Sequence, residues 1–273
     1  MRERTLFSAG LLERLPELRL LATAGARNAA IDLEAATRLG ILVCGTGGGG
    51  VPTMELTWGL LLALLRHIPA EHDGMRRGRW QETVGVGLAG KTLGLLGLGN
   101  IGGGVAAVAH PFGMRVLAWS THLTAERAAE CGAELVDKET LLRKSDVVSI
   151  HLKLGERSTG LLGRRELAWM KPGAVLINTS RGPIVEEAAL VEALRDGKLA
   201  GAGLDVFDEE PLPADHPLRT LDNVVLTPHL GYVTRETYLA FYGETLENIR
   251  AWLAGAPTRV INEDVLGRLR PHP

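Results

Sequence analysis

Charge of one sign, aromatic side chains and cysteine are all scarce in this chain of 273 residues. Its 30 basic and 32 acidic side chains leave a formal net charge of -2, so no basic field attracts nucleic acid or an anionic membrane. Aromatic residues make up only 4% of the chain, too few for a surface on which bases would stack. The composition therefore predicts no nucleic-acid partner.

Cysteines and long apolar runs are also few. Cys44 and Cys131 are the only two cysteines, which excludes a disulfide framework and a cysteine-rich metal site. The most apolar stretch, residues 56–65, is too short to span a bilayer. No apolar core of a secretory signal follows Met1. We expect a cytoplasmic protein with no metal and no membrane partner.

What the chain does contain is a regular alternation of short apolar runs and amphipathic stretches. We predict strands over residues 18–24, 40–45, 92–99, 115–119, 146–152, 173–179, 201–207 and 223–229. Helices are predicted over residues 33–39, 52–66, 124–131, 138–144, 186–195 and 235–253. Apolar strands separated by helices predict an α/β fold with a doubly wound parallel sheet of the Rossmann type.

Two domains are predicted from this order. Residues 73–232 would form a dinucleotide-binding domain. Residues 1–72 and 233–273 would form a smaller substrate domain, because the helix over 235–253 leaves the sheet and returns to the N-terminal region. The helix over 52–66 is apolar around most of its circumference, which predicts burial between layers or between subunits.

A glycine-rich turn lies between the strand at 92–99 and the helix after it. Its sequence GLGNIG has the G-x-G-x-x-G spacing, in which Gly97 permits a tight turn, Gly99 lets the backbone approach a pyrophosphate and Gly102 packs the helix on the strand. Helix N–H groups near Asn100 and Ile101 would face the phosphates. The spacing and its strand–helix context predict a dinucleotide site.

The next strand ends at Ser120 and Thr121, where an acidic residue would normally bind the adenosine ribose. A carboxylate there repels a 2′-phosphate, whereas a serine removes the repulsion and can donate a hydrogen bond. His122 and Arg127 lie nearby in the sequence and could add donors or charge. The pattern favours NADP, with NAD bound through Ser120 as the alternative.

Three polar residues follow other strand ends: Arg181, Glu210 and His229. A guanidinium can bind a carboxylate, an imidazolium can protonate a developing alkoxide, and a carboxylate can orient the imidazole. These are the parts that hydride transfer to a 2-keto acid requires. From the spacing alone, each of the three could equally be a surface residue.

Residues 90–232 resemble the D-isomer-specific 2-hydroxyacid dehydrogenases. The matching segments are GKTLGLLGLGNIG, SDVVSIHLKL, MKPGAVLINTSRGPIVEEAALVEALRDGKLAGAGLDVFDEEP and NVVLTPHLG. The resemblance implies that Arg181 binds substrate, that Glu210 and His229 form the acid–base pair, and that Asp205 lies near the nicotinamide carboxamide. We also place Thr179 and Gly231 among the predicted cofactor contacts.

The resemblance further implies a flavodoxin-like substrate domain and a homodimer formed through the helix over 52–66 and the arm after it. Backbone amides around Ala26 and Arg27 would hold the carboxylate of a small 2-keto or 2-hydroxy acid. The usual Gly-x-Asp-Asn of that loop is replaced by residues 26–29, ARNA, which leaves the particular acid open. Family members begin with a strand–helix–strand segment before the residues equivalent to 2–5, so we expect an incomplete substrate domain with an exposed sheet edge.

Three other readings are kept open. A phosphite-oxidising relative uses a similar Arg–Glu–His set, and corepressors of this fold sense the cofactor while retaining the catalytic residues. An inactive truncated paralogue is the third. Glu210 disfavours formate dehydrogenase activity, because those relatives carry glutamine at this position.

Overall fold

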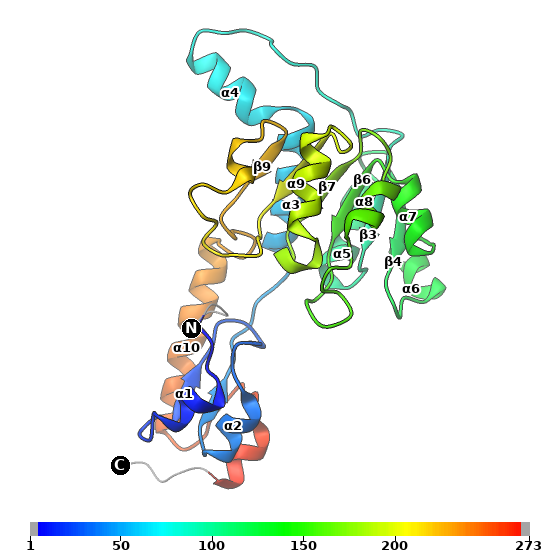
Figure 1. The fold of residues 1–273 in the computed structure, drawn as a ribbon. Coiled ribbons are helices and arrows are strands. Elements are labelled where there is room, and N and C mark those ends of the chain that lie inside the picture. Colours follow the sequence, from blue (N-terminus) through cyan, green and yellow to red (C-terminus); the bar gives the residue numbers. More distant parts are fainter. Residues whose placement is uncertain (1–4, 269–273) are drawn as a thin grey trace. The chain divides into compact units, whose positions relative to one another are not determined.

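The computed structural model of the chain describes residues 5–268, and it divides into two compact units (Figure 1). Unit 1 combines Met1–Gly49 with Val233–Pro273, and unit 2 is Gly50–Tyr232. The expectation about residues 2–5 falls mostly outside the described residues.

Unit 2 is built on a seven-stranded, fully parallel sheet with the order β5-β4-β3-β6-β7-β8-β9. The strands are β3 (Thr92–Leu96), β4 (Arg115–Trp119), β5 (Glu134–Leu135), β6 (Val147–Ile150), β7 (Val175–Asn178), β8 (Gly201–Leu204) and β9 (Val224–Leu226). The sequence predicted all of these except β5. Strands β6 and β7 are buried along their whole length, as expected for a sheet covered on both faces.

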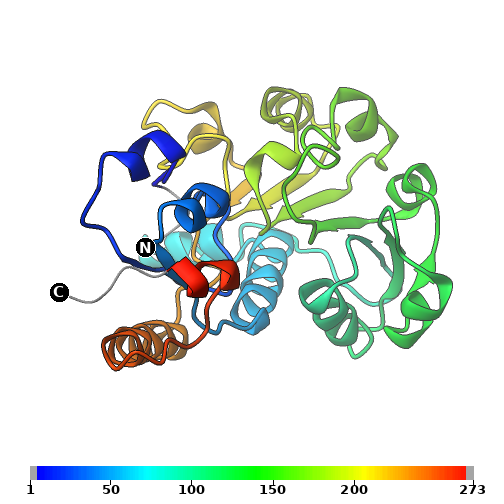
Figure 2. The same cartoon turned by 90° about the horizontal axis from the view of Figure 1, so that it is seen from below.

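Helices cover both faces of this sheet (Figures 1 and 2). Helices α3 (Val51–Leu65), α5 (Asn100–Ala109) and α6 (Ala125–Glu130) share one apolar cluster with strand residues such as Leu95. Helices α7 (Lys138–Lys144), α8 (Arg164–Trp169) and α9 (Glu187–Arg195) share a second cluster with Leu96. Successive strand side chains point to opposite faces, so neighbouring leucines of one strand enter different cores.

The carboxyl ends of the strands form one edge of the sheet. The register pairs Leu96 with Trp119 on one side and with Ile150 on the other, and Ile150 in turn pairs with Asn178. Asn178 pairs with Leu204, and Leu204 with Leu226. The loops that carry the predicted cofactor and catalytic residues therefore all leave the sheet at the same edge, where ligands bind in folds of this class.

Residues 50–72 differ from the predicted domain division. The prediction placed them in the substrate domain, but α3 packs against α5 and β8 and belongs to unit 2. The physical reason is its apolar surface, since Trp58, Leu60 and Leu61 are at most 6% exposed. At its other end unit 2 extends to Tyr232, and unit 1 resumes at Val233.

A helix that the sequence analysis did not predict follows α3. Helix α4 (Ile68–Arg76) has the sequence IPAEHDGMR, in which polar and charged side chains predominate. Gly74 is its only buried residue, so the helix has no apolar face that would give a helical pattern in the sequence.

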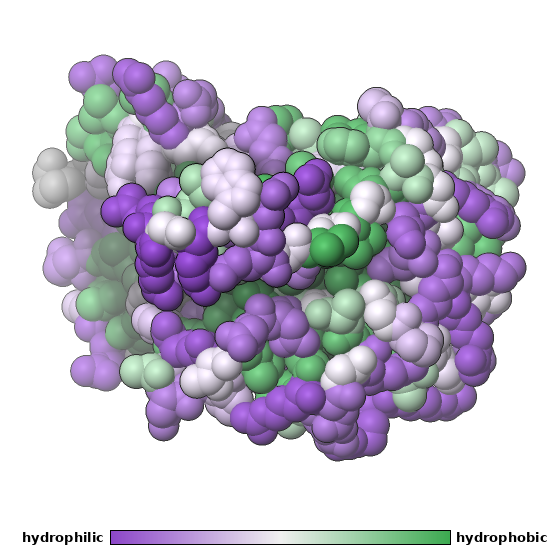
Figure 3. All heavy atoms as spheres, turned by 90° about the horizontal axis from the view of Figure 1, so that it is seen from above, coloured by the Kyte–Doolittle hydropathy of each residue, from purple (hydrophilic) through white to green (hydrophobic). Residues whose placement is uncertain are grey.

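From above, polar and apolar side chains intermingle on the visible surface of the molecule (Figure 3).

Unit 1 contains a two-stranded parallel sheet, β1 (Leu20–Ala22) and β2 (Leu42–Cys44). Helices α1 (Ala9–Glu13), α2 (Leu33–Arg38) and α10 (Arg235–Leu253) and the 3-10 helix η3 (Glu263–Arg268) complete it. Helix α10 has the predicted bounds. Two buried asparagines, Asn248 and Asn262, hydrogen-bond the C-terminal segment to the backbone of Gly45, Ile41 and Val43.

Residues 5–268 contain neither a transmembrane helix nor a metal-binding cluster. No helix in this range is long and apolar enough to cross a membrane. The same residues contain no group of three or more His, Cys, Asp or Glu side chains arranged to hold a metal ion.

Candidate active site

The glycine turn after β3 has the geometry that the sequence predicted. Gly97 has φ +99°, a left-handed conformation that favours glycine, and a Cβ there would lie 2.5 Å from the carbonyl oxygen of His151. A Cβ on Gly102 would lie 2.2 Å from the carbonyl oxygen of Gly97, so only glycine lets α5 approach the strand this closely.

Packing within the protein does not explain why residue 99 is a glycine. A Cβ there would meet no described heavy atom within 4 Å, so no protein contact explains the glycine. The open space lies at the N-terminus of α5, where backbone N–H groups without helical acceptors and the helix dipole favour an anion. Gly97, Gly99, Asn100, Ile101 and Gly102 therefore fit a bound pyrophosphate.

Ser120 and Thr121 lie just beyond the end of β4, next to the glycine turn. The N–H of Gly97 donates to the carbonyl oxygen of Trp119 over 2.8 Å, which joins the two segments. Ser120 is half-buried, and its hydroxyl has no hydrogen-bond partner within residues 5–268. A polar group available at this position suits a ribose or phosphate oxygen.

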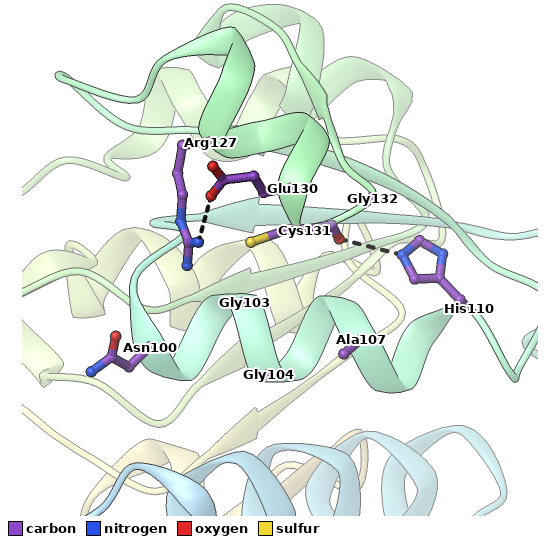
Figure 4. A pocket seen from close by; sticks show the side chains of 9 residues that line it. All are labelled: Asn100, Gly103, Gly104, Ala107, His110, Arg127, Glu130, Cys131 and Gly132. Atoms are coloured by element: carbon purple, nitrogen blue, oxygen red, sulfur yellow. Dashed lines mark hydrogen bonds and ion pairs between the residues drawn. The ribbon is translucent and has the colours of Figure 1, made fainter.

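A cavity of about 600 Å³ runs along the outer side of α5, between α5 and α6 (Figure 4). Two further glycines of α5, Gly103 and Gly104, line this cavity. A Cβ on Gly103 would lie 3.3 Å from Sγ of Cys131, and one on Gly104 would lie 2.7 Å from Sδ of Met54. Gly103 and Gly104 thus allow α6 and α3 to pack closely against α5.

His229 and Glu210 form the centre of the candidate active site. Nδ1 of His229 lies 2.6 Å from Oε2 of Glu210, and the N–H of Phe207 donates to the other carboxylate oxygen over 3.2 Å. Both side chains are about one-fifth exposed. A carboxylate on Nδ1 fixes the ring orientation and leaves Nε2 as the nitrogen that can exchange a proton with a ligand.

Asp205 organises the turn that carries His229. Its carboxylate accepts hydrogen bonds from the Thr227 hydroxyl over 2.5 Å, the Leu230 N–H over 2.7 Å and the Gly231 N–H over 2.8 Å. The turn places His229 at φ +57°, which costs energy for a residue other than glycine. Burial raises the pKa of the Asp205 carboxyl, although these donors act in the opposite direction.

Arg181 follows β7 and lies close to the loop that carries Glu210. Asn178 hydrogen-bonds both the carbonyl oxygen of Arg181 and the N–H of Ser180, each over 3.0 Å, and so fixes the turn. A Cβ on Gly182 would lie 2.1 Å from the carbonyl carbon of Phe207. The glycine therefore allows the Arg181 turn to pack directly against the residues that follow β8.

Two threonines of α3 belong to this region, and neither was predicted from the sequence. Thr53 donates to the carbonyl oxygen of Gly231 over 3.0 Å, and Thr57 shares a buried hydrogen bond of 2.8 Å with Thr179. Their spacing of four residues on an otherwise apolar helix was the available signal. Because we placed α3 in the other domain, these contacts were not expected.

Ala26 and Arg27 lie in unit 1, on the loop after β1. The loop is held by the Thr46 hydroxyl, which accepts from the Gly25 N–H over 2.8 Å, and by the side chain of Asn28, which donates to Thr23 over 2.8 Å. Both residues are exposed, and no acceptor among residues 5–268 binds their backbone N–H groups. These amides can therefore bind an anion.

The fold and the site together define a dinucleotide-dependent oxidoreductase, and comparison with known proteins specifies the family. Residues 58–231 match the family described as "D-isomer specific 2-hydroxyacid dehydrogenase, NAD binding domain". A glyoxylate reductase from Aeropyrum pernix is 43% identical over 272 residues, covering 96% of this chain and 81% of the relative.

Two solved structures show the same likeness. Phosphoglycerate oxidoreductase from Vibrio cholerae has a TM-score of 0.87 at 36% identity, covering 93% of this chain and 83% of that one. An acyclic imino acid reductase solved with NADPH and D-Arg has a TM-score of 0.79 at 31% identity, covering 94% and 83%.

The chain belongs to the D-isomer-specific 2-hydroxyacid dehydrogenase family. It is an oxidoreductase that uses a nicotinamide cofactor to interconvert a D-2-hydroxy acid and its 2-keto acid. The predicted fold class and activity are thus confirmed.

Proposed function

We propose that Arg181, Glu210 and His229 carry the chemistry of this chain, in the reduction of a small 2-keto acid. The observation that supports this most directly is the 2.6 Å contact between His229 and Glu210, at the sheet edge that also carries the glycine turn. The Arg181 guanidinium binds the substrate carboxylate, and the backbone amides of Ala26 and Arg27 are its further ligands.

Reduction of the carbonyl requires one hydride and one proton. The reduced nicotinamide, when bound, supplies the hydride. His229 donates the proton from Nε2 to the carbonyl oxygen, while Glu210 holds Nδ1 and favours the imidazolium. Asp205 and Gly231 keep the His229 turn in place, and together with Thr179 they would hold the nicotinamide. In the oxidative direction, His229 takes the proton back.

The pH profile of a Glu210→Gln variant tests this assignment. The imidazolium loses its charged partner, so the pH above which the rate of keto-acid reduction falls should move down relative to the wild-type chain. Glu192→Gln, on the exposed side of α9, is the matched control and should keep the wild-type profile. An unchanged profile in Glu210→Gln would contradict the pairing.

For the cofactor, we propose NADP in preference to NAD. The half-buried Ser120 and its neighbour Thr121 present hydroxyls at the end of β4, where no carboxylate repels a 2′-phosphate. The related imino acid reductase was solved with NADPH. Quenching of tryptophan fluorescence, with Trp119 next to Ser120, should give a lower Kd for NADPH than for NADH. Equal or tighter NADH binding would contradict the preference.

The chain is proposed to act as a homodimer through the segment from α3 to residue 87. Apolar side chains are exposed there, including Ile68 at 52%, Trp80 at 72% and Val84 at 91%. Solvent exposure of such a series is unfavourable, and a second copy would cover it. Light scattering at micromolar concentration should report a dimer, and Trp80→Ser with Val84→Ser should shift it to monomer.

A further inference from the structure

A hydrogen bond joins the two loops on either side of the glycine turn. Nη1 of Arg157, on the loop after β6, donates to Nε2 of His122, on the loop after β4, over 2.9 Å. Strands β4 and β6 are the two neighbours of β3, and their ends are tied to it through Trp119 and His151. The bond therefore bridges the two loops beyond the end of β3, where the dinucleotide turn begins.

The loop that carries Arg157 is fixed by its neighbour Ser158. The Ser158 side chain is only 8% exposed; its hydroxyl accepts from the Gly155 N–H over 2.9 Å and donates to the carbonyl oxygen of Lys153 over 2.7 Å. Thr159 donates to the carbonyl oxygen of Gly155 over 3.0 Å. With its backbone held in this way, Arg157 loses less conformational entropy when it binds a ligand.

The charge around Arg157 differs from that around Arg127, the arginine nearer in sequence to Ser120. Arg127 forms an ion pair with Glu130 at 3.0 Å (Figure 4). A phosphate approaching Arg127 would meet the charge of that carboxylate as well. Arg157 forms no ion pair among residues 5–268, not even with the neighbouring Glu156, and residues 120–125 contain no carboxylate.

We propose that Arg157 is the cationic ligand of the 2′-phosphate of NADP, reaching it from the loop after β6, with His122 as its positioning residue. The assignment rests on the proposed preference for NADP and names a residue for it. A guanidinium suits this task because its paired N–H groups match two phosphate oxygens. Since Arg157 can only donate, His122 accepts at Nε2 and carries its proton on Nδ1, which leaves that N–H as a further donor.

The test uses two ligands that lack nicotinamide, 2′-phospho-ADP-ribose and ADP-ribose, so it is independent of turnover. Binding of each to the full chain is measured by titration calorimetry for wild type, Arg157→Gln, Arg157→Lys and Arg127→Gln. Arg157→Gln should weaken 2′-phospho-ADP-ribose by about tenfold or more, and ADP-ribose by less than about twofold. Arg157→Lys should recover part of the loss, and Arg127→Gln should match wild type.

Three results would overturn the assignment. An equal loss for both ligands would place Arg157 against the shared adenosine or pyrophosphate. A loss confined to Arg127→Gln would assign the phosphate to Arg127. If Arg157→Gln keeps the wild-type preference for the 2′-phosphate, the role of Arg157 is wrong while the NADP preference stands. A wild-type chain that does not prefer the 2′-phosphate would overturn the cofactor proposal and this one together, without bearing on His229.

Discussion

The two units hold their functional residues in different ways. In unit 2, the turns around Arg181 and His229 leave a buried seven-stranded sheet, and side chains such as Asn178 and Asp205 hydrogen-bond several backbone groups in each turn. In unit 1, the loop with Ala26 and Arg27 leaves a two-stranded sheet. The residues proposed for acid–base chemistry thus leave the larger sheet, whereas the proposed carboxylate contacts leave the smaller one.

Helix α10 of unit 1 is much more exposed to solvent than helix α3 of unit 2. Its apolar side chains at intervals of three and four residues remain open to solvent, namely Leu239 at 65%, Tyr242 at 70%, Leu246 at 48%, Ile249 at 37% and Leu253 at 63%. Only Asn248 of this helix is buried. The two apolar clusters of unit 1 contain seven and three buried residues and are smaller than those of unit 2, so we expect unit 1 to unfold first.

The largest effect should come from His229→Ala in unit 2. Removal of the proton donor should lower kcat for keto-acid reduction by about a thousandfold, within the usual range for general acids. Binding of NADPH, followed by fluorescence, should change by less than about threefold, because the pyrophosphate turn is untouched. His72→Ala, an exposed histidine of α4, serves as the control. Near-normal turnover in His229→Ala would rule out its role as the acid.

A stability effect of intermediate size is expected from Asn262→Ala in unit 1. Asn262 is 7% exposed, accepts from the Val43 N–H over 2.8 Å and donates to the carbonyl oxygen of Ile41 over 3.0 Å. Its loss leaves buried backbone groups unpaired and should cost about 2 kcal/mol. Calorimetry should show the unit 1 transition moving down while NADPH affinity stays constant. Asn223→Ala in unit 2 should leave that transition in place.

Acid should destabilise unit 2 through His151. Burial lowers the pKa of this histidine to about 4, from an ordinary value of 6.5, and its Nδ1 has no hydrogen-bond partner within residues 5–268. The unfolded chain then binds the proton more tightly, so stability is lost as the pH falls from 6.5 to 4. The loss is at most about 3.5 kcal/mol, because each of the 2.5 pH units contributes about 1.4 kcal/mol.

Urea unfolding of unit 2 at pH 7 and pH 4.5 measures this loss. In His151→Gln the difference between the two pH values should shrink, whereas the control His72→Gln should keep it. If His151→Gln retains the full acid loss, another group carries it.

The smallest effect is expected at the surface of α10. Leu239→Ala should change the free energy of unfolding by less than about 0.5 kcal/mol, because the side chain is 65% exposed. Leu60→Ala in α3, where the side chain is 2% exposed, should cost about 2–5 kcal/mol. A comparable cost for Leu239→Ala would mean that another chain covers α10 in solution.

Much of unit 2 could be read from the sequence because its signals are local. The apolar runs of β6 and β7, the spacing of Gly97, Gly99 and Gly102, and the bounds of α10 all follow from residues close together in the chain. Short elements with mixed composition, such as β5 and α4, gave no comparable pattern. Their conformation depends on neighbours that are distant in sequence.

The polar residues at strand ends were also visible in the sequence, since parallel strands bring their carboxyl ends to one edge. Their partnerships were not visible. They depend on contacts across 22 to 178 positions of the chain. Such contacts join Asp205 to the His229 turn, Thr53 and Thr57 of α3 to the rest of unit 2, and Arg157 to His122. Such contacts exist only once the apolar faces have packed, because no local pattern encodes which loops become neighbours.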